Sequence, residues 1–224
     1  MIKHRKRIIC AGTYRSGSTW LFNVIRFIFL SNHIDIQSNF ANSGSWDDKS
    51  SVHLIKTHIY QPQLMRGNVT TFTTIRDLRD IVASGMRVKM EGILDKGDNL
   101  SFEKIVSFID VTVEQYRDWK EHSDLEVRFE EMMKNKKGTI QKIANVLNQR
   151  VDVDRVHEAV DRLSAPLRFD PVSLLWPNHI SNPAMDRSII FETLNEEQVA
   201  IIEEKYQDFI KTAAEKAKTD RLLS

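Results

Sequence analysis

The chain has 224 residues, of which 41% are hydrophobic and 28% are charged. These values are ordinary for a globular protein and exclude a disordered, collagen-like or coiled-coil chain. Lys and Arg number 32 against 31 Asp and Glu, which gives a formal net charge of +1. Because this balance indicates neither nucleic acid nor membrane as a partner, we expect any binding of a polyanion to depend on local clustering of charge.

Cysteine content and apolar patterning both indicate a soluble protein. The one cysteine, Cys10, excludes an intrachain disulfide and a cysteine-rich metal site, and it suits a reducing compartment. The richest apolar stretch, residues 20–30, contains Asn23 and Arg26 and is far shorter than the ~20 residues needed to span a bilayer. We therefore expect a cytoplasmic protein without a membrane span, and we make no prediction of its oligomeric state.

The apolar pattern alternates between strand-like and helix-like segments along the chain. It predicts strands over 7–12, 52–57, 70–75 and 125–128, and helices over 18–30, 77–89, 101–121, 139–148 and 154–163. Residues 31–51 are rich in Ser and Asn and are predicted to be loop, and proline clustering predicts an irregular loop at 164–188. A capping-box pattern, Asn195 to Gln198, predicts the start of a last helix.

This alternation predicts the fold class. Strands that alternate with helices favour an α/β fold in which a central, mostly parallel sheet is covered by helices on both faces, as a three-layer, P-loop-like sandwich. No internal repeat or linker divides the chain, so we expect a single domain over residues 1–224. In such sheets, ligands bind at the carboxyl ends of the strands, near the point where the strand order reverses.

The turn from the first strand to the first helix carries a phosphate-binding pattern. Gly12 and Gly17 are five residues apart, which lets backbone N–H groups curl around an anion at a helix N-terminus. This resembles the nucleotide P-loop, except that Ser18 occupies the lysine position. Arg15 supplies a cation from another place in the loop, so the anion held here can differ from a nucleoside triphosphate.

Two further elements place cations and a histidine at the ends of neighbouring strands. Arg76 ends one strand and Ser84 follows about two turns into the next helix, an arrangement that can hold a phosphate. Lys56 and His58 end another strand, where alternation puts them on the same side, about 7 Å apart. A histidine beside a lysine should stay neutral near pH 7 and can act as a base.

Together these three segments resemble the sulfotransferase family that uses 3′-phosphoadenosine 5′-phosphosulfate (PAPS) as donor, and they are closer to its short bacterial members. The resemblance lies in Thr13–Trp20, Lys56–His58 and Arg76–Ser84, and extends to Leu125–Glu131 and Pro177–Ser181. It implies an enzyme that moves a sulfuryl group from PAPS to a small-molecule or carbohydrate hydroxyl, releasing 3′-phosphoadenosine 5′-phosphate (PAP), with no metal ion.

The resemblance also implies a role for each residue. His58 would be the general base, while Lys56 and Arg15 would stabilise charge on the bridging and sulfuryl oxygens. The remaining donor-binding positions would be Ser16, Gly17, Ser18, Thr19, Trp20, Arg76, Ser84 and Phe129, the two aromatic residues lying around adenine. Because in-line sulfuryl transfer needs positioning and positive charge more than covalent chemistry, this set is chemically sufficient.

Departures from the family pattern leave several alternatives open. Tyr14 stands where a proline is common, and no Arg-Lys-Gly segment closes over the 3′-phosphate, so Arg168 or Arg187 could take its place. His179 is a rival for the role of base. A P-loop small-molecule kinase or other nucleotide-binding protein is the alternative function, although the residues that would hold magnesium are not evident. A non-catalytic binder of PAP is a third possibility, against which Lys56 and His58 argue.

Overall fold

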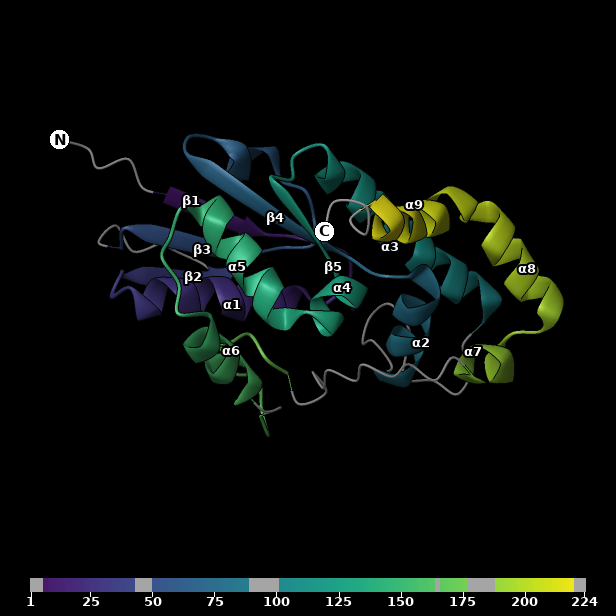
Figure 1. Ribbon diagram of the computed structural model, residues 1–224. Helices are drawn as coiled ribbons and strands as arrows, with labels where there is room; N and C mark the ends of the chain where they lie inside the picture. Colours follow the sequence, from purple (N-terminus) through teal and green to yellow (C-terminus); the bar gives the residue numbers. More distant parts are fainter. Residues whose placement is uncertain (1–5, 43–49, 89–100, 164–165, 177–187, 220–224) are drawn as a thin grey trace.

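A computed structural model describes residues 6–42, 50–88, 101–163, 166–176 and 188–219. One five-stranded sheet runs through it in the order β2-β3-β1-β4-β5, and every strand pair is parallel (Figure 1). The strands are β1 (Lys6–Cys10), β2 (Ile36–Phe40), β3 (Val52–Lys56), β4 (Val69–Ile75) and β5 (Leu125–Arg128). The mostly parallel sheet predicted from the sequence is confirmed.

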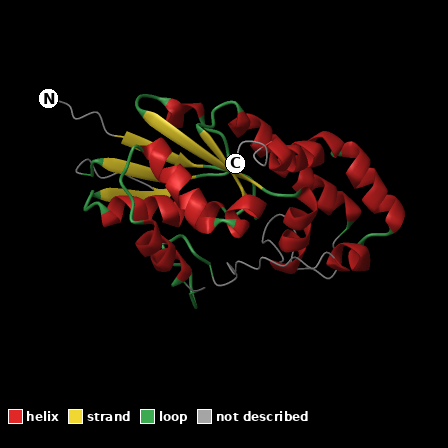
Figure 2. Cartoon of the chain, in the orientation of Figure 1, coloured by secondary structure: helices red, strands yellow, loops and turns green. Residues whose placement is uncertain are grey.

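Side chains of the central strand β1 alternate between two cores. Ile8 and Cys10 pack on the face covered by α1 (Ser18–Ser31), α5 (Lys136–Leu147) and α6 (Val153–Asp161). Ile9 and Ala11 point to the opposite face, where they meet Trp119 of α3 (Phe102–Lys120). Helices therefore cover both faces of the sheet, which confirms the layered α/β architecture (Figure 2).

A helical lobe extends from the β4 side of the sheet. It contains α2 (Leu78–Val88), α3, α7 (Ser188–Thr193), α8 (Glu196–Lys205) and α9 (Gln207–Thr219), which lie together at one end of the molecule (Figure 1). Their shared core includes Ile81, Phe108 and Ile202, all buried. The predicted capping box is confirmed, because the side chains of Asn195 and Gln198 each bond the other's backbone N–H at the start of α8.

Several elements differ from the sequence prediction. Residues 36–40 form the edge strand β2 where a loop was predicted; all five are half-buried, so they lack the apolar run of a central strand. The short helices α4 (Phe129–Lys134) and α7 and the 3₁₀ turn η1 (Pro62–Met65) were not predicted. The last helix is interrupted at Tyr206, which separates α8 from α9.

The positions of β3 and β4 on either side of β1 create the strand-order reversal at which ligands bind. The chain leaves β1, passes through β2 and β3 on one side, and then crosses to β4 on the other. The carboxyl ends of β3, β1 and β4 therefore lie next to one another.

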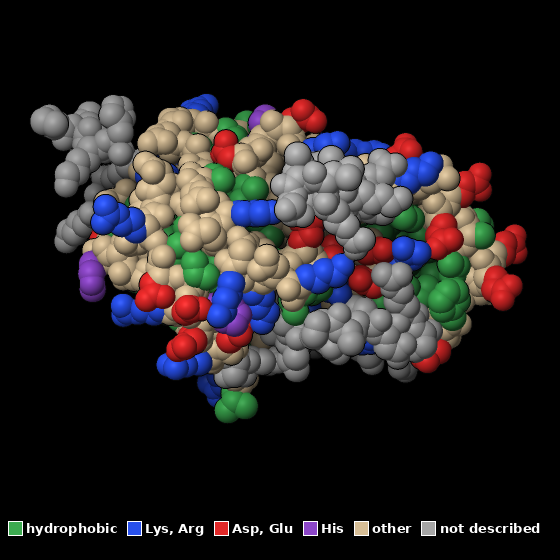
Figure 3. Space-filling model, viewed as in Figure 1, with side chains coloured by type: hydrophobic (Ala, Val, Ile, Leu, Met, Phe, Trp, Pro, Cys, Tyr) green, Lys and Arg blue, Asp and Glu red, His purple; other side chains and the backbone are tan. Residues whose placement is uncertain are grey.

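No helix in the described part of the chain is long and apolar enough to cross a membrane. Acidic and basic side chains are interspersed over the face seen in Figure 3. That the chain is a single domain stays a prediction.

Candidate active site

The first loop is shaped by two glycines with positive φ angles. Gly12 has φ +136°, and a Cβ atom there would stand 2.1 Å from Thr74 Oγ1 and 2.7 Å from Thr74 N, so only glycine lets the loop pass this close to β4. Gly17 has φ +89° and precedes α1, which begins without a side-chain cap. The amide groups of the first turn are thus left to a ligand, as an anion-binding helix N-terminus requires.

Two hydroxyl groups of the loop, those of Ser16 and Thr19, form hydrogen bonds within the protein. Ser16 Oγ donates to Thr13 O at 2.6 Å and lies 2.5 Å from Thr74 Oγ1. Thr19 Oγ1 accepts a hydrogen bond from Lys56 Nζ. Ser18 is buried, and its carbonyl oxygen accepts from Cys10 Sγ at 3.3 Å. The buried hydroxyl of Thr13, by contrast, has no hydrogen-bond partner among the described residues.

Lys56 is the last residue of β3 and is 2% exposed. Its ammonium group also lies 5.6 Å from the ring centre of Phe40, the residue opposite it on β2. Burial lowers the pKa of Lys56 to about 8, and the nearby charge of Arg15 contributes to this decrease. The interaction with Cys10 acts in the opposite direction and raises this pKa in part. This pKa keeps the ammonium mostly protonated at neutral pH, in a site that an anion would stabilise.

His58 lies two residues beyond the end of β3, so the expected strand alternation does not apply to it. Its Nδ1 is 2.7 Å from the carbonyl oxygen of Gly12. Because a carbonyl can only accept, Nδ1 carries the proton and Nε2 is left with its lone pair. Burial and the charge of Lys56 lower the pKa of His58 to about 4. The hydrogen bond to Gly12 raises this pKa, but by a smaller amount.

Two neighbours hold His58 in this orientation. The indole Nε1 of Trp119 donates to the His58 carbonyl oxygen at 3.2 Å. The ring of Tyr14 lies 4.4 Å from the imidazole, centre to centre, and 6.3 Å from the ring of Phe108. Sequence reasoning missed these supporting residues, since nothing in the local pattern links Trp119 of α3 with a segment 61 residues away.

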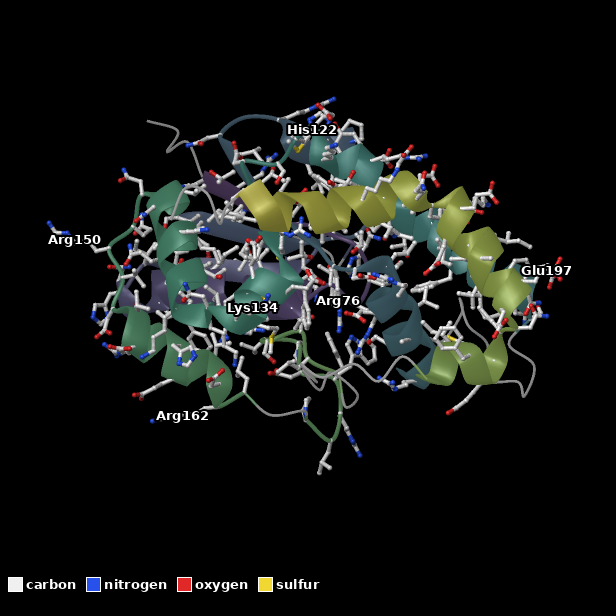
Figure 4. The ribbon with its side chains drawn as sticks, turned by 45° about the vertical axis from the view of Figure 1, so that its right-hand side comes forward. Arg76, His122, Lys134, Arg150, Arg162 and Glu197 are labelled. Atoms are coloured by element: carbon white, nitrogen blue, oxygen red, sulfur yellow. The ribbon has the colours of Figure 1, made fainter. Side chains whose placement is uncertain are left out.

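Arg76 directly follows the last residue of β4, and it is 3% exposed. Figure 4 shows it near the middle of the molecule, between the sheet and the helical lobe. Its Nη1 donates to the carbonyl oxygen of Arg15 at 3.2 Å, and its Nε lies 3.8 Å from Asp80. The guanidinium carbon stands 3.9 Å above the ring centre of Phe129. The planar group is thereby fixed in orientation by an aromatic face and a backbone acceptor.

Arg15 connects the first loop with α2. Its backbone has φ +57°, and its side-chain Nε donates to Ser84 Oγ at 2.9 Å. Burial lowers the pKa of Arg15 to about 10, and the like charge of Arg76 adds to this effect. The structure thus brings Arg15 of the first loop into one cluster with Arg76, which follows β4, and Ser84 of α2.

The two aromatic residues expected around adenine lie at the foot of the loop. Phe129 begins α4 and packs so closely under Gly17 that a Cβ atom there would be 3.0 Å from its Cδ2. Trp20 lies in the first turn of α1 and is half-buried. Its indole Nε1 is buried and has no hydrogen-bond partner among the described residues. Both rings therefore flank the N-terminus of α1.

Of the alternative residues, one is described and two lie outside the described part of the chain. Arg168 is described and its side chain is exposed. His179 and Arg187, with the loop Pro177–Ser181, fall outside the described residues. Among the described residues, no group of three or more His, Cys, Asp or Glu side chains could hold a metal ion.

A parallel sheet whose strand ends carry an amide-lined loop, a buried lysine, a histidine and an arginine is typical of α/β proteins that bind phosphate groups. The family model of the sulfotransferase domain matches residues 42–217. The chain therefore belongs to the sulfotransferase family, and it is a sulfotransferase. Among curated proteins, none matches the sequence.

Solved structures of similar fold agree with this assignment. The crystal structure of mouse sulfotransferase SULT7A1 complexed with PAP is 13% identical, covers 96% of this chain and 89% of that chain, and has a TM-score of 0.65. A retinol dehydratase in complex with androsterone and inactive cofactor PAP is 12% identical, with coverage of 92% and 80% and a TM-score of 0.63. At such identities the likeness establishes the fold alone.

Proposed function

We propose that this enzyme transfers a sulfuryl group from PAPS to an acceptor hydroxyl, with His58 as the general base. One observation carries the proposal: Lys56 and His58 on one side of the first loop, and Arg76 on the other, meet at the adjacent carboxyl ends of β3, β1 and β4. The complexes of SULT7A1 and of retinol dehydratase contain PAP, which supports the same donor here.

The donor would extend from β3 to α2 across the first loop. Its 5′-phosphosulfate would accept hydrogen bonds from the uncapped amide groups of Gly17 to Trp20, while Arg76 and Ser84 would hold the 3′-phosphate. Adenine would lie against the rings of Trp20 and Phe129. The resemblance assigns Arg15 to the 5′-phosphosulfate as well, and its Nε donates to Ser84 Oγ at 2.9 Å.

The chemistry needs one base and one cation near the sulfur. As the acceptor oxygen forms its bond to sulfur, the bond from sulfur to the bridging phosphate oxygen breaks, and the acceptor proton passes to His58 Nε2. The Gly12 carbonyl fixes the tautomer in which Nε2 can take this proton. Lys56 stabilises the charge that develops on the bridging oxygen, and its bond to Thr19 Oγ1 keeps the ammonium beside the loop.

The acceptor would approach His58 along an aromatic surface. Tyr14 packs 4.4 Å from the imidazole and is half-buried, so part of its ring remains open to a ligand. An aromatic face suits either an apolar ring or the C–H face of a sugar. The retinol dehydratase complexes contain androsterone and retinol, which supports a small molecule. We propose a small-molecule or carbohydrate hydroxyl as the acceptor.

The proposal is tested by following label from sulfur-labelled PAPS into a panel of alcohols, phenols and sugars. His58→Ala should abolish transfer yet leave PAP binding within about threefold, because the imidazole acts on the acceptor proton and not on the donor's phosphates. His179→Ala serves as the comparison, since it removes the rival base. Transfer that survives in His58→Ala and is lost in His179→Ala would reverse the assignment.

A further inference from the structure

The helix α4 begins where β5 ends, beside the turn that carries Arg76. β4 and β5 are paired in parallel, and the last pair of their register joins Ile75 with Arg128. Because paired parallel strands run in the same direction, the residues that follow these two leave the sheet side by side. The start of α4 therefore lies next to the turn between β4 and α2.

Side-chain contacts continue where the strand pairing stops. The guanidinium carbon of Arg76 stands 3.9 Å above the ring centre of Phe129. The backbone N–H of Asp77 donates a hydrogen bond to Glu130 Oε1 at 2.9 Å. The first two residues of α4 thus hold the turn at two points, one on the side chain of Arg76 and one on the peptide group that follows it.

The peptide group that Glu130 contacts lies at the N-terminus of α2. The carbonyl oxygen of Asp77 accepts a hydrogen bond from Ile81 N at 3.0 Å, and Asp77 Oδ1 accepts one from Arg79 N at 2.9 Å. Asp77 therefore caps α2, and its own N–H stands outside the hydrogen bonds of the helix. The bond to Glu130 fixes the orientation of this peptide group, and with it the direction in which the side chain of Arg76 leaves the backbone.

Packing alone does not explain a carboxyl group at position 130. Glu130 is half-buried, and its Oε2 is buried without a hydrogen-bond partner among the described residues. Burying a carboxyl oxygen without a partner costs free energy, so an apolar side chain would stabilise α4 better. The bond from Glu130 Oε1 to the Asp77 N–H gives the carboxyl group a different role, which is to fix the turn that carries Arg76.

We propose that Glu130 is a positioning residue for donor binding: by accepting the Asp77 N–H it directs Arg76 toward the 3′-phosphate, without touching the nucleotide itself. This inference rests on the proposed function, in which Arg76 contacts that phosphate. It adds a residue to which the sequence assigns no role, although Glu130 directly follows Phe129.

The test compares two nucleotides that differ only in the 3′-phosphate. Affinities of PAP and adenosine 5′-monophosphate are measured by calorimetry for the wild-type chain and for Glu130→Leu, which removes the acceptor. We expect PAP binding to weaken about tenfold and adenosine 5′-monophosphate binding to weaken less than about threefold, because only PAP carries the group that Arg76 would hold. At saturating PAPS, kcat should stay within about threefold of the wild-type value, since Lys56 and His58 are left in place.

Conservative variants separate the hydrogen bond from the charge. Glu130→Gln keeps a side-chain oxygen that can accept the Asp77 N–H, so PAP affinity should return to within about threefold of wild type. Glu130→Asp keeps the carboxyl group but draws it back by one methylene, so it should lose part of the preference for PAP. Glu130→Asp also serves as the test if Glu130→Leu fails to fold.

A variant in another part of the core controls for lost stability. Ile143→Val removes one methylene from a fully buried residue of α5, so it should lower the melting temperature and leave both nucleotide affinities unchanged. If Ile143→Val reduced the PAP preference as much as Glu130→Leu does, the effect would be one of stability and the inference would fail.

Three further results would overturn the inference. Equal losses for both nucleotides in Glu130→Leu would show a general disturbance of the site, and unchanged PAP affinity would show that Arg76 needs no support from Glu130. A loss in Glu130→Gln as large as in Glu130→Leu would show that the hydrogen-bond acceptor is not what matters. These results leave the donor assignment intact. A wild-type chain that fails to bind PAP would instead refute the proposed function itself.

Discussion

The ionisation of Lys56 and His58 should give the enzyme an unusual pH profile. Burial lowers the pKa of Lys56 from 10.5 to about 8 and that of His58 from 6.5 to about 4. If transfer needs a charged lysine and a neutral histidine, the active form predominates between these two values. The donor's own negative charge should raise the pKa of Lys56 once it is bound, so the profile of kcat/KM, which reports the free enzyme, is the one to measure.

The size of the effect follows from these values. At pH 9 a lysine with a pKa of about 8 is about 10% protonated, against about 97% for an ordinary lysine. At pH 5.5 a histidine with a pKa of about 4 is about 97% neutral, against about 9% for an ordinary one. We therefore expect kcat/KM to fall about tenfold between pH 7 and pH 9, and to stay nearly constant from pH 7 down to pH 5.5.

The assay is transfer from sulfur-labelled PAPS at sub-saturating donor, with an aliphatic alcohol as acceptor so that the acceptor does not titrate in this range. Lys56→Arg is the matched variant, since its guanidinium keeps its charge at pH 9. Whatever activity it retains should not fall between pH 7 and pH 9. A wild-type profile that declines below pH 6.5, or that declines only above about pH 10, would refute the assigned ionisations.

Other predictions concern the loop, the donor contact and stability. Gly12→Ala should lower the free energy of unfolding in urea by about 2 kcal/mol or more, because the new Cβ atom would overlap Thr74; Gly67→Ala, at φ +85° with nothing within 4 Å, should cost clearly less. Arg76→Ala should weaken PAP binding about 10- to 100-fold in calorimetry, and an unchanged affinity would remove Arg76 from the site. Between pH 8 and pH 10.5 the unfolded chain keeps a proton on Lys56 that the folded chain has lost, so the free energy of unfolding should rise with pH by up to about 3 kcal/mol. Lys56→Met should lack this rise, and an equal rise in the variant would show that Lys56 is not its source.

The sequence predicted the parts of the fold that depend on local apolar pattern. β1, β3, β4 and β5 were found within a residue or two because each is a short segment that is apolar, rich in β-branched residues or alternating in polarity. The strand β2 was missed, since its sequence Ile-Gln-Ser-Asn-Phe at the sheet edge is half-buried throughout and has no buried face to reveal. The helix α4 was missed because it follows β5 without a turn residue between them.

The candidate site shows the same division between local and long-range information. The spacing of Gly12 and Gly17 predicted a loop shaped to hold an anion. This prediction was possible because the positive φ angles that the loop needs fall on two glycines, which can be read from the sequence. The direction of the Arg15 side chain was not predictable, since it depends on a left-handed φ angle and on a hydroxyl 69 residues away. The tautomer of His58 likewise depends on a carbonyl group of another segment.

The most direct measurement of the central claim is calorimetric titration of the purified chain with PAP in the presence of a magnesium chelator. We expect one molecule to bind per chain, without any requirement for metal, because the first loop, Arg76 and Ser84 supply the contacts that the donor's two phosphate ends need. An absence of binding under these conditions, together with tight binding of ATP when magnesium is restored, would contradict the account and favour a kinase.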